Sequence, residues 1–173
     1  CSMSDPTTTD PDRTYTSVPA NEAKSRTRLV QFKVPGQPQG KQRARGGYGG
    51  KPYTPKKTRE YEALISSCAA RARGVQRPFS GPVGVIITAY RRRPAQPAPG
   101  HECRDGIEVH GHRLCTCKPD ADNVAKAVLD GMTLARCWGD DDQVAHLVVW
   151  KHWCNVGAAP RLSVVAYEIG GEG

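Results

Sequence analysis

The segment KPDADNVAKAVLDGM, residues 118–132, joins two alternating aspartates to the start of an amphipathic pattern. The spacing of its apolar residues predicts a helix over residues 123–135, with a buried stripe formed by Ala125, Val128, Leu129 and Met132. Either Asp120 or Asp122 suits the helix N-cap, and one cap contributes about 1 kcal/mol. Two carboxylates exceed that need, and their repulsion costs free energy unless a cation lies between them.

The pattern on either side of this segment predicts two helices and four strands. Strands are expected at residues 26–34, 81–93, 143–153 and 160–169, the second of them central and the last two adjacent. Residues 35–54, dense in Gly and Pro, are expected to form a loop. The other helix should have Thr54 as N-cap and Pro55 as its first residue, and should end at Gly74. This order predicts an α/β (α+β) fold, in which two helices pack on a small mixed sheet.

The composition suits one domain with a polyanionic partner. The chain has 173 residues, a net charge of +8 and 38% hydrophobic residues. Residues 1–25 are polar and aperiodic, which predicts a disordered tail before a folded domain at 26–170. There is no apolar run of membrane-spanning length and no apolar leader, so we expect a cytoplasmic protein.

A second acidic cluster, Asp140, Asp141 and Asp142, follows the predicted helix. Three consecutive acids are most often a solvated turn. Because they lie after the helix, they reach Asp120 and Asp122 only if the next strand carries one of them back or a second subunit supplies it. Converging carboxylates suit Mg²⁺ or Mn²⁺, which prefer oxygen ligands.

Lys126 lies one helical turn after Asp122 and on the same face. Its ammonium group suits stabilisation of charge on a phosphate in the transition state. The alternative is a helix salt bridge with Asp122 or Asp130, which contributes a few tenths of a kcal/mol.

Basic residues without any acid fill the segment from residue 41 to residue 59. They are Lys41, Arg43, Arg45, Lys51, Lys56, Lys57 and Arg59. Such a segment is typical of phosphate binding. Together with the acidic residues, it indicates a metal-dependent nuclease.

The chain resembles the RusA family of Holliday junction resolvases. The resemblance rests on KPDADNVAKAVLDGM followed by WGDDDQV (residues 138–144), with GKQRARG and YTPKKTREYE upstream. It covers roughly residues 28–168 and implies a compact RusA-like homodimer that nicks opposing strands of four-way DNA junctions with Mg²⁺ or Mn²⁺. Family members are often encoded by phages, so the resemblance also makes a phage origin plausible.

Carried onto this chain, the resemblance assigns roles to particular residues. The metal ligands would be Asp120, Asp122 and Asp141, with Asp140 in support, and Lys126 would be catalytic. The extra acid at Asp142 leaves the choice among the three consecutive aspartates open by one residue. DNA contacts are expected from Lys41, Arg43, Arg45, Lys51, Lys56, Lys57 and Lys118.

The loop at residues 94–117 is longer and richer in Cys and His than the resemblance leads us to expect. With seven cysteines in all and no secretion signal, reduced thiols or a metal site are expected instead of a disulfide framework. A structural Zn²⁺ within residues 101–117 is conceivable, although the spacing is tighter than usual, and a hairpin arm with free thiols is the alternative. The candidate ligands are His101, Cys103, His110, His112, Cys115 and Cys117.

Three other functions remain open at this point. A nuclease selective for flaps or forks would carry the same residues. A catalytically silent protein that binds branched DNA would keep the basic segment and lose the carboxylates, all of which are present. A third possibility, a zinc-dependent DNA-binding module, would require bound zinc and no cleavage.

Overall fold

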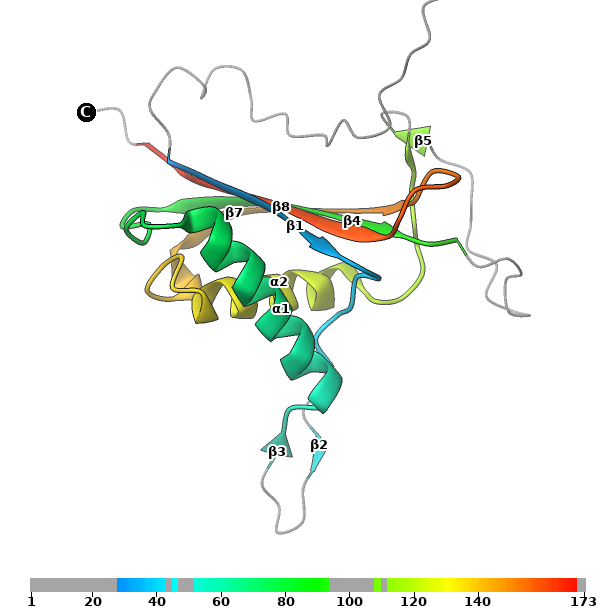
Figure 1. Ribbon diagram of the computed structural model, residues 1–173, viewed down its shortest axis with the longest axis horizontal. Helices are drawn as coiled ribbons and strands as arrows, with labels where there is room; N and C mark the ends of the chain where they lie inside the picture. The colour runs from blue at the N-terminus through cyan, green and yellow to red at the C-terminus, as the bar shows by residue number, and fades with distance from the viewer. Residues whose placement is uncertain (1–27, 43–44, 47–51, 94–107, 110–111, 171–173) are drawn as a thin grey trace, which may run out of the picture.

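A mixed sheet forms one layer of the protein and two helices form the other (Figure 1). The computed structural model describes residues 28–42, 45–46, 52–93, 108–109 and 112–170. The element order in this part of the chain confirms the predicted α+β fold. No helix in these ranges is long and apolar enough to cross a membrane.

The sheet has the strand order β1-β8-β4-β7. These strands are β1 (Leu29–Pro35), β8 (Arg161–Glu168), β4 (Val83–Arg91) and β7 (Val144–Trp153). β8 pairs antiparallel with both β1 and β4, whereas β7 pairs parallel with β4 at the edge of the sheet. β4 is buried over almost its whole length, as expected of a central strand.

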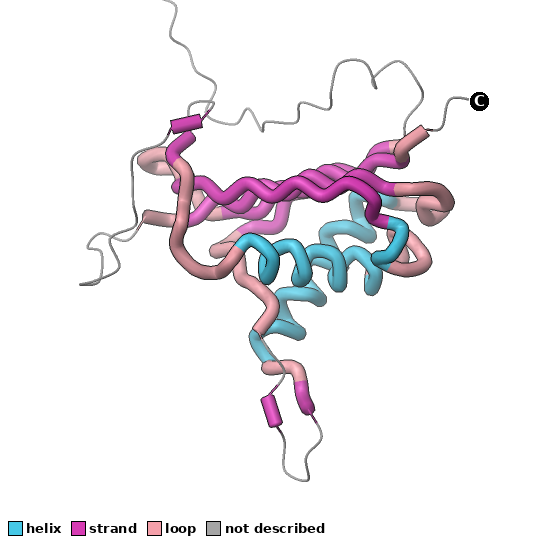
Figure 2. Tube along the Cα trace, turned by 180° about the vertical axis from the view of Figure 1, so that it is seen from behind, coloured by secondary structure: helices cyan, strands magenta, loops and turns pink. Residues whose placement is uncertain are grey.

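Helices α1 (Lys56–Arg73) and α2 (Ala121–Leu134) cover the same face of the sheet (Figure 2). α1 ends at Gly74, as predicted; this glycine has φ 58, a conformation that suits glycine best. Its N-cap is Pro55, one residue later than predicted. α2, in contrast, starts at Ala121, two residues before the predicted Asn123, with Asp120 at its N-cap position.

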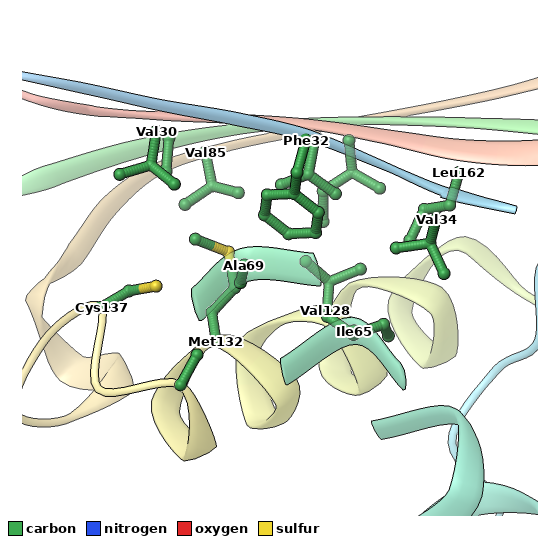
Figure 3. Packing of buried hydrophobic residues seen from close by; sticks show 14 of the residues in the cluster. Val30, Phe32, Val34, Ile65, Ala69, Val85, Val128, Met132, Cys137 and Leu162 are labelled. Atoms are coloured by element: carbon green, nitrogen blue, oxygen red, sulfur yellow. The ribbon is translucent and has the colours of Figure 1, made fainter. Parts of the chain in front are cut away.

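The main core lies between the two layers (Figure 3). β1 alternates, so that Val30, Phe32 and Val34 point inward. They meet Ile65 and Ala69 of α1 and further residues of α2, including Val128 and Met132. The predicted stripe of α2 is therefore the buried face, with Leu129 only partly buried.

One predicted neighbour relation is wrong, because β7 and β8 are not adjacent. β4 lies between them, and the segment from Cys154 to Pro160 crosses the end of β4, where the Cys154 N–H donates to the Arg91 carbonyl at 2.7 Å. The predicted loop at 35–54 also contains a small antiparallel pair, β2 (Arg45–Gly46) and β3 (Pro52–Tyr53). A second such pair is formed by β5 (Glu108–Val109) and β6 (His112–Arg113).

Candidate active site and nucleic-acid groove

The turn at residues 117–123 presents two carboxylates at the N-terminus of α2. Asp120 and Asp122 are both exposed. The side chain of Asp120 makes no capping hydrogen bond, although its carbonyl accepts from the Val124 N–H at 3.1 Å. The capping role considered from the sequence is therefore not performed by the Asp120 carboxylate, which faces solvent.

Two basic side chains donate hydrogen bonds to the backbone of the segment that leads into this turn. Lys151 on β7 donates from Nζ to the Cys117 carbonyl at 2.6 Å. Its own carbonyl accepts from the Cys115 N–H at 2.8 Å. The guanidinium group of Arg91, at the end of β4, donates to the Lys118 carbonyl. Successive carbonyls just before Asp120 are thus fixed to the central and edge strands of the sheet.

Lys126 is exposed one turn into α2. Within the described ranges it forms no ion pair with Asp122 or Asp130, so the alternative of a helix salt bridge is not realised there. Its ammonium group is accessible on the same stripe of the helix as Asp122.

The second acidic cluster lies beyond the other end of α2, in the 3-10 turn η1 (Asp141–Gln143). Asp140 caps η1 by accepting from the Asp141 N–H at 2.7 Å. The side-chain hydrogen bond with Asp140, with burial and the nearby charges of Asp140 and Asp130, raises the pKa of Asp141. Asp141 and Asp142 are exposed.

Within one protomer the two acidic groups are separated by the length of α2. A helix of this length spans about 20 Å. β7, the strand that follows η1, runs back toward Asp120, but the residue that it brings there is Lys151. The negative charges of Asp120 and Asp122 act on the Lys151 ammonium group. No set of three potential metal ligands converges among the described residues. Of the two routes open from the sequence, the strand does not supply the third carboxylate.

A groove of about 1170 Å³ leads to Asp120. Its walls are the segment at residues 37–42, the first turns of α1 and the turn at residues 118–123. The cationic side chains that line it are Lys41, Lys57, Arg91 and Lys118. A concave surface with several cations beside exposed carboxylates suits a phosphate backbone.

A protein-family model matches most of the chain. The model described as endodeoxyribonuclease RusA matches residues 35–165. The chain belongs to the RusA family. The matched range contains the groove, both acidic clusters and Lys126, and no curated protein matches the chain. The RusA family consists of endodeoxyribonucleases that bind branched DNA and resolve Holliday junctions, as the resemblance implied.

The basic residues predicted to contact DNA have different surroundings in this RusA protein. Lys57 and Lys118 are exposed and line the groove. Lys56 is exposed, and its Nζ lies 3.7 Å from Oε1 of Glu60. Lys41 lines the groove too, but its ammonium group pairs with Asp130.

Three other predicted contacts have no described side chain. Arg43 and Lys51 lie outside the described residues, and only the backbone of Arg45 is described. Their roles stay predictions, as do those of the predicted tail at residues 1–25 and most of the loop at 94–117.

Arg91 and Lys151 were missed by the sequence reasoning. Lys151 is half-buried, and desolvation lowers the pKa of its ammonium group, with a further lowering from nearby Arg91. A signal was present in the sequence, because Lys151 lies within the largely apolar run VVWKHW, and a lysine that is partly buried usually has a partner. Its contact with the Cys117 carbonyl depends on tertiary structure.

The cysteines depart in part from expectation. Cys68, Cys115, Cys137 and Cys154 are free thiols. Cys117, however, is disulfide-bonded, so the expectation of reduced thiols is wrong at this residue. A disulfide sulfur is not a thiolate ligand, which removes Cys117 from the zinc set considered above. Three other members of that set, His101, Cys103 and His110, lie outside the described residues.

Proposed function

We propose that this protein is a divalent-metal-dependent homodimer that resolves Holliday junctions by paired symmetric nicks. The observation that carries the proposal is the pair of exposed carboxylates at the start of α2, of which Asp120 lines the basic groove and Asp122 follows it two residues later. The RusA family supports junction resolution in general. The metal, the pairing of the nicks and the dimer go beyond that family assignment.

The donor set at α2 fits Mg²⁺ or Mn²⁺. These ions are bound in proteins through one or two carboxylates, together with waters and substrate phosphate oxygens. Asp120 and Asp122 provide two such carboxylates, both exposed, at the start of α2. When bound, the ion supplies activation of water and stabilisation of charge on the phosphate.

The protein's own groups then orient the DNA. The cations Lys57 and Lys118 bind the phosphate backbone in the groove, so that one phosphate lies beside Asp120. Lys126, a turn further along α2, stabilises the negative charge that develops on that phosphate. Water attacks phosphorus and the bond to the 3′ oxygen breaks, which leaves a 5′-phosphate and a 3′-hydroxyl.

A homodimer is supported by the outer edge of β7. Residues 144–150, VAHLVVW, have no partner strand on that side among the described residues, and Leu147 at their centre is 43% exposed. Natural edge strands usually carry a lysine, a proline or a bulge against strand addition. Residues 144–150 contain neither a lysine nor a proline, and the register shift of β7 against β4 lies at its first residues, where Val83 pairs with Val144 and Gly84 with His146. From His146 onward the pairing is regular, so we expect a second copy to pair there about a two-fold axis.

Such a pair also accounts for the separated acidic groups. In an antiparallel β7 pair centred on Leu147, the start of one β7 meets the end of the other. Asp141 of one protomer then lies beside the partner's Lys151, next to which lie the partner's Asp120 and Asp122. Each site would hold carboxylates from both chains, and the two-fold axis would relate two sites on opposite strands of a junction.

Cleavage of a labelled synthetic four-way junction tests the proposed function. Wild-type protein should give paired symmetric nicks with Mg²⁺ and none with EDTA. Asp122→Asn should lose nicking by several orders of magnitude while it still binds the junction. Glu108→Gln, which removes an exposed carboxylate elsewhere, is the matched control and should nick normally.

Other outcomes would reject particular parts of the proposal. Binding without cleavage in both Mg²⁺ and Mn²⁺ would indicate a catalytically silent protein that binds branched DNA. Faster cleavage of flaps or forks than of four-way junctions would indicate a different substrate.

A further inference from the structure

The segment at residues 37–42 packs directly on the first turn of α2. The Lys41 N–H donates to the Asn123 carbonyl at 2.8 Å. A Cβ atom at Gly40 would lie 2.7 Å from the Cβ of Pro119 and 2.9 Å from that of Asn123. Only glycine allows this approach, so the backbone of the segment touches the turn on both sides of Asp120 and Asp122.

The side chain of Lys41 extends from this point along α2 to a pair of carboxylates. Its ammonium group pairs with Asp130 of α2 and lies 3.8 Å from Glu62 of α1. The hydrogen bond with Asp130 raises the pKa of Lys41, with further contributions from the charges of Asp130, Glu62 and Asp141. Glu62 is only 8% exposed.

The surroundings of Lys41 argue against a role in binding phosphate. Two carboxylates already surround its single positive charge. Moving the ammonium group to a phosphate would leave Glu62 with no ion-pair partner among the described residues, and an uncompensated buried carboxylate is costly. Lys57, in the same groove, is exposed and forms no ion pair among the described residues.

We infer that Lys41 is a positioning residue that ties the segment at 37–42 to both helices and thereby fixes the turn carrying Asp120 and Asp122. The role in catalysis rests on the proposed function, but the role in ordering the turn does not. The sequence placed Lys41 among the DNA contacts, and the geometry assigns it to the support of the carboxylates. A displacement of reacting groups by about 1 Å lowers a rate by up to about a hundredfold.

The first experiment compares Lys41→Met with Lys57→Met, which removes an exposed lysine from the same groove. Junction affinity is measured without a catalytic metal over a range of salt concentrations, and single-turnover nicking is measured at saturating protein. Lys41→Met should slow nicking between about tenfold and a hundredfold with an unchanged salt dependence. Lys57→Met should make the negative slope of log affinity against log salt shallower by about 0.9.

A second readout does not depend on activity. Amide hydrogen exchange at residues 119–124 of the free protein should become faster in Lys41→Met and stay unchanged in Lys57→Met. If the wild type nicks no junction at all, the proposed function fails, and this exchange measurement still decides the role of Lys41.

Asp130→Asn covers the possibility that Lys41→Met folds poorly. This variant keeps every positive charge and removes the main partner of Lys41. If Lys41 positions the turn, Asp130→Asn slows nicking and speeds exchange as Lys41→Met does. The inference is overturned if Lys41→Met makes the negative salt slope shallower by about 0.9 with normal exchange, or if Asp130→Asn nicks and exchanges like the wild type.

Discussion

Among single residues, Glu168 makes a well-defined set of polar contacts away from the groove. Its Oε1 accepts from the backbone N–H groups of Ser80 and Gly81, both at 2.9 Å, and from the Ser80 hydroxyl at 3.2 Å. Arg28 lies 3.6 Å from Oε2. The Gly81 and Ser80 N–H groups hold the pKa of Glu168 below its usual value. The ionised carboxylate therefore fastens the end of β8 to the segment that leads into β4.

We expect Glu168→Gln to lower the free energy of unfolding at pH 7 by about 2 kcal/mol, because hydrogen bonds to a charged acceptor contribute roughly that amount. The pKa is lower in the folded state, so the contribution is present above the unfolded pKa of about 4.3. It is lost as the pH falls through the folded pKa. Urea unfolding of both proteins from neutral to acid pH should show two curves that converge at the acid end.

Glu60→Gln is the control for this prediction. Glu60 is an exposed partner of Lys56, so its replacement should change the stability by only a few tenths of a kcal/mol. A difference between wild type and Glu168→Gln that stays constant down to strongly acid pH would contradict the assignment.

Between elements, α1 and α2 approach each other closely at Gly131. A Cβ atom there would lie 2.6 Å from Cγ2 of Ile65 and 3.1 Å from the Glu62 carbonyl oxygen. Ile65 is fully buried, so neither helix has room to yield. The absence of a side chain at Gly131 thus sets the spacing of the two helices that frame the groove.

Gly131→Ala should therefore destabilise the protein, although alanine is the better helix former by about 1 kcal/mol. Overpacking of a full core costs about 1–3 kcal/mol and outweighs the gain in helix propensity. Thermal unfolding measures the net effect. Leu134→Ala, at an exposed position of the same helix, should change little, and a Gly131→Ala protein more stable than the wild type would show that the helices can move apart.

The elements that could be predicted are those whose signals lie close together in the sequence. Both helices are set by apolar spacing and by their ends, such as Gly74 after α1, and these signals lie within a few residues of the elements they define. The strand order was not predictable in the same way. β7 and β8 follow each other in sequence, yet β4 separates them, and a pairing across many residues leaves no local signal.

The candidate site also has one part that is encoded locally and another part that depends on the tertiary structure. Asp120, Asp122 and Lys126 form a local motif, so their arrangement on one turn and one helix could be read from the sequence. The ion pair of Lys41 with Asp130 joins residues 89 positions apart. The charge of Lys41 suggested a DNA contact, and only the fold shows that two carboxylates, Asp130 and Glu62, surround this lysine.

For the molecule as a whole, the arrangement of its acidic groups has a consequence for the number of active sites in a dimer. Asp122 and Asp141 lie near opposite ends of α2. In the proposed β7 pair, each site takes Asp122 from one chain and Asp141 from the other. Neither an Asp122→Asn homodimer nor an Asp141→Asn homodimer would then retain a complete site.

A heterodimer of these two variants should regain activity. Its Asp141→Asn chain still supplies Asp120 and Asp122, and its Asp122→Asn chain still supplies Asp141, so one site is complete and the other has lost both carboxylates. Heterodimers purified through two different tags should therefore nick one strand of a labelled junction, whereas the wild type nicks two. A heterodimer of wild type with Asp122→Asn is the control and should also nick one strand. If this control cuts and the doubly mutant heterodimer does not, each protomer must use its own carboxylates, and the shared site is wrong.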